Sequence, residues 1–132
     1  MIKEFNIKTR AGSEMLDITG EVGRIVAESG IEKGVCYIYI PHTTAGVTIN
    51  ENADPDVTRD ILAELAKIIP WNDGYRHGEG NSAAHIKASM MGFSQVVFVE
   101  NGSLVLGTWQ GIYFCEFDGP RTRKVYVKVI KG

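Results

Sequence analysis

The sequence is poor in the features that mark specialised protein classes. Cys36 and Cys115 are its two cysteines, and each lies in a run of strand-forming residues, so we interpret both as buried, reduced thiols. No apolar run approaches the roughly 18 residues of a membrane-spanning helix. The first ten residues lack the apolar stretch of a signal peptide. We therefore expect a cytoplasmic protein that has no membrane partner.

The chain also lacks a basic excess and the common catalytic motifs. Its formal net charge is −2, whereas a protein that coats nucleic acid carries many more cations than anions, so we expect no nucleic-acid partner. There is no G-x-S-x-G, no Walker loop, no C-x-x-C and no G-x-G-x-x-G after a strand. Serine hydrolases, P-loop NTPases, dithiol oxidoreductases and dinucleotide-binding enzymes therefore have no support in the sequence.

What is present describes one ordinary globular domain over residues 1–132. Hydrophobic residues make up 44% of the chain, which is enough for one core, and no linker or internal repeat divides it. The order of the predicted elements indicates an α+β fold, with mostly antiparallel β-sheets, two main helices and one short helix. We expect the helices to lie on one side of the sheets.

Apolar spacing and turn residues place the individual elements. Helices are predicted from a cap at Asp17 or Thr19 to Ser29, from an Asp54 cap to Pro70, and over 82–91. Besides a first strand over 2–9, three hairpins are predicted: 34–41 with 45–51, two strands around Asn101-Gly102, and 109–117 with 121–130.

The stretch "HGEGNSAAH", from His77 to His85, runs from a glycine-rich turn into a helix. The first N–H groups of a helix have no intrahelical partner, so they can bind an anion near Asn81 and Ser82. The alternative is that the turn only caps a buried helix and that His85 hydrogen-bonds a carbonyl group.

The stretch "PHTTAGVTINE" offers His42 beside two threonine hydroxyls, at Thr43 and Thr44, that suit a phosphate or a turn equally. Glu51 ends the same stretch. If the strands around it form a tight hairpin, Glu51 lies roughly 20 Å from His42. A site that uses both residues then needs a second subunit. Glu51 and Asp60 could hold Mg²⁺, or they could belong to a solvated face.

The last predicted hairpin places Glu116 opposite Arg123. The two form either a structural cross-strand ion pair, or part of a site in which Arg121 and Arg123 grip phosphate or carboxylate. Gln110 is in phase with the same strand face at its other end.

Three motifs together resemble a known family. They are "PHTTAGVTINENADPDVTRDI", "HGEGNSAAHIKASMMG" and "GSLVLGTWQGIYFCEFDGPR", and with the basic tail they are similar to the YjbQ family from about Ile18 onward. The resemblance implies a compact α+β fold, a homotrimer and a site near the subunit contacts. It also implies secondary thiamine-phosphate synthase activity, which joins an aminopyrimidine diphosphate to a thiazole phosphate and releases pyrophosphate.

The motif positions of that family fall here on Asn50 and Thr108 as well as on the residues already named. We predict catalytic roles for His42, Glu51 and Glu116. The residues predicted to bind a small phosphorylated ligand are Thr43, Thr44, Asn81, Ser82, Gln110, Arg121 and Arg123. The residues predicted to bind a divalent metal, Zn²⁺ or Mg²⁺, are His77, His85 and His42, with His42 from the same or a neighbouring subunit. Two alternatives stay open: a metal-dependent enzyme that activates water, and a trimeric protein that only binds a ligand or metal.

Overall fold

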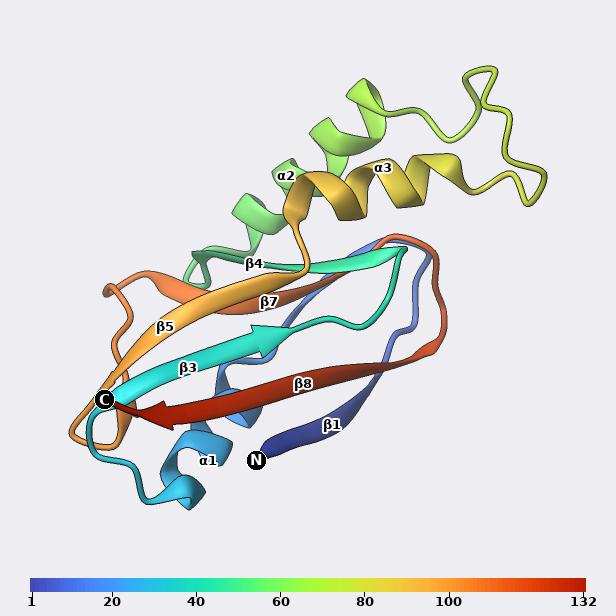
Figure 1. Ribbon diagram of the computed structural model, residues 1–132. Helices are drawn as coiled ribbons and strands as arrows, with labels where there is room; N and C mark the ends of the chain where they lie inside the picture. The colour runs from blue at the N-terminus through green and yellow to red at the C-terminus, as the bar shows by residue number, and fades with distance from the viewer.

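The computed structural model describes residues 1–132 as two antiparallel sheets and three helices (Figure 1). The five-stranded sheet has the order β1 (Ile2–Lys8), β8 (Thr122–Lys131), β3 (Gly34–Tyr39), β5 (Ser94–Glu100) and β6 (Ser103–Leu104). The three-stranded sheet has the order β2 (Glu14–Asp17), β7 (Gln110–Glu116) and β4 (Ala45–Glu51). The helices are α1 (Thr19–Ser29), α2 (Pro55–Ile68) and α3 (Ser82–Met91). The predicted α+β class is confirmed.

The main core lies between the two sheets. Alternate residues of β3 and β8, such as Ile38 and Val127, face Val47 of β4 and Phe114 of β7. Val22 of α1 belongs to the same buried cluster, so α1 closes one side of the space between the sheets. The period of two along each strand decides which side chains enter this layer.

A second core lies on the outer face of the three-stranded sheet, which α2 and α3 cover (Figure 1). Leu65 of α2 and Ala84 of α3 pack there with Tyr113 and Cys115 of β7. Strand β7 is therefore buried on both faces, which explains its nearly continuous apolar sequence. Because α1 lies elsewhere, the prediction that all helices share one side was wrong.

Both cysteines are buried and unpaired, as predicted. Burial raises the pKa of the Cys36 thiol to about 11 and the pKa of Cys115 to about 12. Thiols with such high pKa values are poor nucleophiles at neutral pH. No helix combines the length and the hydropathy needed to cross a bilayer.

Two of the three predicted hairpins were wrong. β3 pairs with β5 and β8, whereas β4 pairs with β7 in the other sheet. β7 and β8 are likewise in different sheets. The short segments between these strands cross from one sheet to the other. Consecutive strands therefore face each other across the core instead of lying side by side.

The other local predictions fared better. The hairpin at Asn101-Gly102 is confirmed: Glu100 faces Ser103, and both turn residues have positive φ, 53° and 71°. α2 begins as predicted, with the Asp54 side chain accepting a hydrogen bond from a backbone N–H of the first turn. The predicted cap of α1 at Asp17 or Thr19 was wrong: Ile18 occupies the N-cap position and makes no side-chain cap, while the Asp17 carboxylate accepts hydrogen bonds from the N–H and the hydroxyl of Thr19.

Gly46 of β4 provides a test of the contact between this strand and the end of α3. A Cβ at Gly46 would lie 2.6 Å from the carbonyl oxygen of Gly92. We predict that Gly46→Ala lowers the free energy of unfolding by about 1–3 kcal/mol in urea titrations, the usual cost of overpacking. Gly12→Ala, where a Cβ meets nothing within 4 Å, is the matched control. Equal stability of the two variants would contradict the packing described.

Candidate functional site

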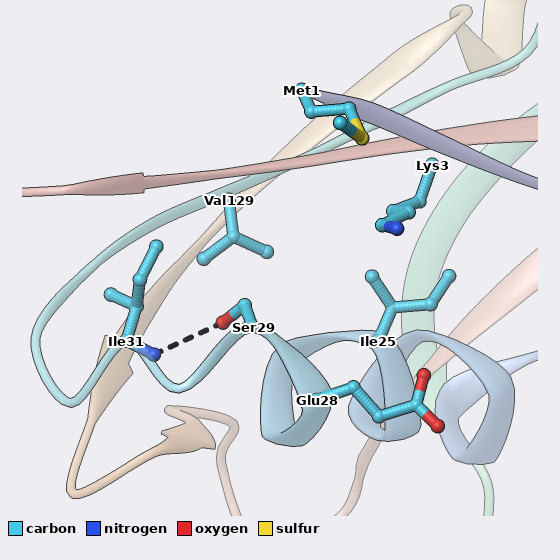
Figure 2. A pocket seen from close by; sticks show the side chains of 7 residues that line it. All are labelled: Met1, Lys3, Ile25, Glu28, Ser29, Ile31 and Val129. Carbon is cyan, nitrogen blue, oxygen red and sulfur yellow. Dashed lines mark hydrogen bonds between the residues drawn. The ribbon is translucent and has the colours of Figure 1, made fainter.

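Two of the hollows in the structure are similar in size and have very different linings. One, of about 300 Å³, lies beside α1 and has an apolar floor that includes Ile25, Ile31 and Val129 (Figure 2). Lys3 and Glu28 are its two charged residues. The other, of about 330 Å³, has no large hydrophobic side chain among its ten lining residues. Convergent polar groups mark the second hollow, the polar pocket, as the candidate site.

Three segments form the polar pocket. They are the crossing from β3 to β4, the turn that leads into α3, and the crossing from β7 to β8. The two crossings between sheets, where hairpins had been predicted, thus contribute most of the lining residues. The lining residues are Pro41, His42, Thr43, Thr44, Glu79, Asn81, His85, Asp118, Arg121 and Arg123.

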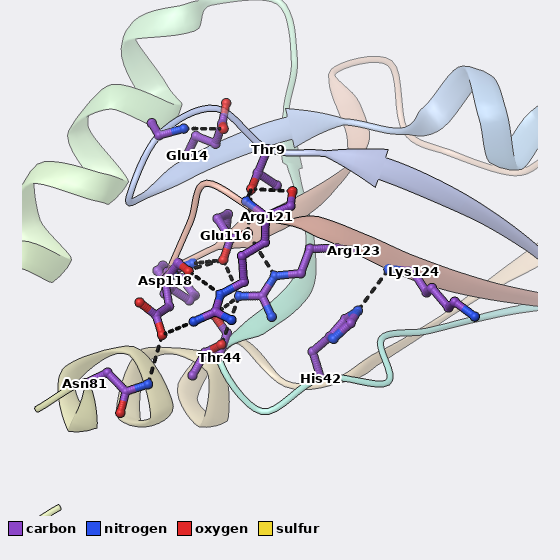
Figure 3. Close-up of polar contacts among 12 residues, drawn as sticks. Thr9, Glu14, His42, Thr44, Asn81, Glu116, Asp118, Arg121, Arg123 and Lys124 are labelled. Atoms are coloured by element: carbon purple, nitrogen blue, oxygen red, sulfur yellow. Dashed lines mark hydrogen bonds and ion pairs between the residues drawn. The ribbon is translucent and has the colours of Figure 1, made fainter. Parts of the chain in front are cut away.

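The Glu116 carboxylate lies buried behind the pocket and accepts five hydrogen bonds (Figure 3). Two come from Nε and Nη2 of Arg123. The hydroxyl of Thr9 donates a third, at 2.7 Å, and the backbone N–H groups of Phe117 and Asp118 donate the others, at 3.0 and 2.9 Å. Such a set of donors satisfies a buried carboxylate almost completely.

Burial alone would raise the pKa of Glu116, but hydrogen bonds from Arg123, the backbone and Thr9 outweigh it and hold the pKa below its ordinary value. The predicted pairing of Glu116 with Arg123 does occur, although the predicted cross-strand geometry was wrong. The side chains meet because each continues the inward face of its strand, after Phe114 in β7 and before Val125 in β8. Glu116 does not line the pocket, so the structure gives it the role of holding Arg123.

Arg123 presents one free edge to the pocket. Nη2 also donates to the Thr44 hydroxyl, at 2.9 Å, whereas Nη1 has no hydrogen-bond partner in the chain (Figure 3). Arg123 is 4% exposed and is fixed by Glu116. Its free N–H groups are therefore preorganised donors rather than a mobile surface charge.

Arg121 is the second guanidinium, and its side chain is half exposed. Its Nε donates to the carbonyl of Asp118 at 2.7 Å, and Nη2 reaches Oδ2 of the same residue at 3.0 Å. Nδ2 of Asn81 donates to that oxygen at 2.8 Å. Asp118 therefore ties Arg121 to the start of α3.

Asn81 occupies the N-cap position of α3 without capping the helix through its side chain. Its Oδ1 is enclosed and has no hydrogen-bond partner. The first N–H groups of α3 therefore receive no side-chain hydrogen bond from the cap residue, although Asn81 itself lines the pocket. Ser82 follows Asn81 but does not line the pocket.

His42 is neutral and oriented. Its Nε2 accepts a hydrogen bond of 2.9 Å from the backbone N–H of Lys124, which leaves the ring proton on Nδ1. Partial burial and the nearby Arg123 lower the pKa of His42, and Glu116 opposes them in part. His42 therefore remains a neutral hydrogen-bond donor at pH 7.

The three histidines do not assemble into one metal site. The rings of His77 and His85 meet edge to face with centroids 5.4 Å apart, and Nε2 of His77 lies 3.8 Å from Glu79. His42 is turned toward the backbone of β8 by its bond to Lys124. No group of three metal-binding side chains forms within the chain. The predicted Zn²⁺ or Mg²⁺ site of three histidines therefore does not form within one subunit.

Besides Ser82 and Glu116, three predicted site residues do not line the pocket: Glu51, His77 and Gln110. Glu51 and Gln110 face each other at the far end of the three-stranded sheet. The side-chain oxygen of Gln110 accepts a hydrogen bond from the backbone N–H of Gly107.

Two charged lining residues, Glu79 and Asp118, were not predicted. Glu79 lies in "HGEGNSAAH" and Asp118 lies in "DGPR". The functional interpretation of these motifs rested on their other residues, because acidic residues are common in turns that have no function.

Comparisons with known proteins agree with this fold along almost the whole chain. The family model described as UPF0047 protein YjbQ-like matches residues 3–132. The YugU protein of Bacillus subtilis is 59% identical over 98% of this chain and 99% of its own length. A crystal structure from Clostridium acetobutylicum has 60% identity and a TM-score of 0.96, covering 97% of this chain and 99% of the other.

The chain belongs to the YjbQ/UPF0047 family. A UPF0047 protein of Methanocaldococcus jannaschii is 52% identical over 98% of this chain and 94% of its own length. A YbjQ-like protein of Sulfolobus solfataricus has the same fold at 33% identity, with a TM-score of 0.95, and covers 100% of this chain and 97% of that one.

In this YjbQ family member, the pair of Glu116 and Arg123 is the feature of the site that stability measurements can test. Glu116→Gln leaves Arg123 buried without its counter-charge, so we predict a loss of about 3–5 kcal/mol in the free energy of unfolding at pH 7. Glu64→Gln, in an exposed pair with Lys67, should change it by less than about 1 kcal/mol.

The difference in unfolding free energy between the parent and Glu116→Gln should also depend on pH. The pKa of Glu116 is lowered in the folded state. The stabilisation that its charged form gives to the fold is therefore complete above the unfolded pKa of about 4.3, and it is lost as pH falls through the folded pKa. The stability difference between parent and Glu116→Gln should therefore shrink below pH 4. A constant difference from pH 7 to pH 2 would contradict the assignment.

Proposed function

We propose that the polar pocket binds the phosphate group of a small molecule. The observation that carries the proposal is the free edge of Arg123, which the buried Glu116 holds toward a pocket without large hydrophobic side chains. Planar guanidinium donors match the oxygens of a phosphate in both geometry and charge.

Other donors surround the same space. The Thr44 hydroxyl accepts from Arg123 and keeps its own proton free to donate. His42 carries its proton on Nδ1 because Nε2 is occupied. With Arg121 and Arg123, the Thr44 hydroxyl and His42 form a set of donors suited to phosphate oxygens.

The reaction that we propose for this site is a thiamine-phosphate synthase-like transfer. In that reaction the thiazole nitrogen attacks the methylene carbon of the aminopyrimidine diphosphate, a C–N bond forms, the C–O bond breaks and pyrophosphate leaves. Arg121 and Arg123 would stabilise the charge that develops on the leaving group. The family resemblance supports this choice, and the pocket supplies the phosphate contacts that it requires.

Phosphate binding can be tested without knowing the rest of the ligand. Arg121→Ala removes a charged donor whose loss leaves the buried Glu116–Arg123 pair intact. We predict that it weakens binding of inorganic phosphate by about 1–3 kcal/mol in calorimetry, the scale of a hydrogen bond to a charge. Arg59→Ala, in α2 and 81% exposed, should bind phosphate like the parent. Absence of phosphate binding in the parent would overturn the proposal.

We also propose that the protein is a homotrimer, in which Glu51 could reach the pocket of a neighbouring subunit. Support comes from the outer face of the five-stranded sheet, where cross-strand neighbours are apolar and exposed. Val96 lies opposite Tyr37 and Phe98 opposite Val35, and Phe98 is 66% exposed. A contiguous apolar face of this kind marks an interface, here with further copies of the chain.

The interface can be tested by charge insertion. We predict a trimer mass for the parent by light scattering at micromolar concentration, and a monomer for Phe98→Glu, because the new carboxylate would be buried without a partner. Met90→Glu, on the exposed side of α3, should remain trimeric. A monomeric parent would contradict the trimer, and dissociation by Met90→Glu alone would move the interface to α3.

A further inference from the structure

We infer that the ring of a heterocyclic phosphate binds on the outer face of α3, in a hollow that adjoins the polar pocket. The inference rests on the proposed phosphate binding and adds a ring subsite beside it. Aromatic rings are bound mostly by apolar and aromatic side chains that cover their faces. The polar pocket has no large hydrophobic side chain, so a heterocyclic ligand needs its apolar cover from an adjoining surface.

A hollow of about 350 Å³ on α3 provides such a surface. It is lined by His85, Ile86, Ser89 and Met90. His85 also lines the polar pocket, so the two hollows meet at this side chain. Met90 lies roughly 7.5 Å beyond His85 along the helix axis. A ring that is joined to its phosphate by a short carbon chain can span a comparable length.

The outer face of α3 is unusually apolar for a helix surface. Ile86 and Met90, one turn apart, are 39% and 57% exposed, whereas Lys87, the one formally charged residue of the helix, is 5% exposed. Surface helices normally turn charged residues outward and apolar residues inward. Exposed apolar side chains that adjoin a polar pocket are typical of a ligand-binding cleft.

The side chains of this hollow suit an aromatic ring. His85 packs edge to face against His77, with ring centroids 5.4 Å apart, so its imidazole is supported where the two hollows meet. Stacking on an imidazole and contact with the Met90 sulfur both add to the gain from apolar burial. None of the four lining residues is Asp, Glu, Lys or Arg, so the hollow favours a ring over a second phosphate.

A matched pair of ligands isolates the contribution of the ring. Hydroxyethylthiazole phosphate and ethyl phosphate share the phosphate and the two-carbon chain, and they differ in the heterocycle. In calorimetry we expect the thiazole phosphate to bind at least about ten-fold more tightly. In Met90→Ala this ratio should fall at least about three-fold, because a contact with the ring is lost. Ile68→Ala, at the end of α2 and 56% exposed, should keep the ratio.

The outcomes separate the ring subsite from the phosphate site. If inorganic phosphate binds but the two organic phosphates bind equally, the ring subsite is overturned and phosphate binding stands. The same holds if Met90→Ala keeps the ratio of the parent or if Ile68→Ala lowers it equally. Dissociation of the trimer by Met90→Glu would assign this face of α3 to a subunit contact and would also overturn the ring subsite. If none of the phosphate compounds binds, both proposals fall.

Discussion

The buried ion pair between Glu116 and Arg123 is the constraint on which the site depends. Glu116 ends a strand of the three-stranded sheet and Arg123 begins a strand of the five-stranded sheet, so their hydrogen bonds join the two sheets at one end of the core. Thr9, just after β1, and Thr44, just before β4, join the same network. Removing one charge would leave the other buried and unpaired, at a cost of several kcal/mol. The network therefore fixes the sheets and the free guanidinium edge together.

The electrostatics of the pocket favour recognition by geometry over attraction by net charge. Each arginine already has a carboxylate partner, Glu116 for Arg123 and Asp118 for Arg121. The charge of the lining is thus largely compensated, and in the proposed function selectivity would come from where the remaining donors and acceptors point. Arg123 is buried and Arg121 half exposed, so one guanidinium is fixed by its surroundings whereas the other has room to change its position.

Sequence reasoning predicted local structure better than it predicted strand partners. Asp54, Pro55 and the Asn101-Gly102 turn act within a few residues, and they defined α2 and the β5–β6 hairpin correctly. Alternation in β7 and β8 correctly brought Glu116 toward Arg123, because it shows which side chains face inward. It does not show whether the facing strand is a neighbour in the same sheet or lies across the core. The same ambiguity hid Asp118, whose role becomes visible only when the crossing to β8 is placed beside α3.

The most direct test of this account is a crystal structure of the protein with inorganic phosphate. The account predicts a phosphate with an oxygen about 2.7–3.2 Å from Nη1 of Arg123, with the ion pair to Glu116 intact. Phosphate bound elsewhere while the polar pocket holds none, or an Arg123 turned away from Glu116 to reach it, would contradict the account.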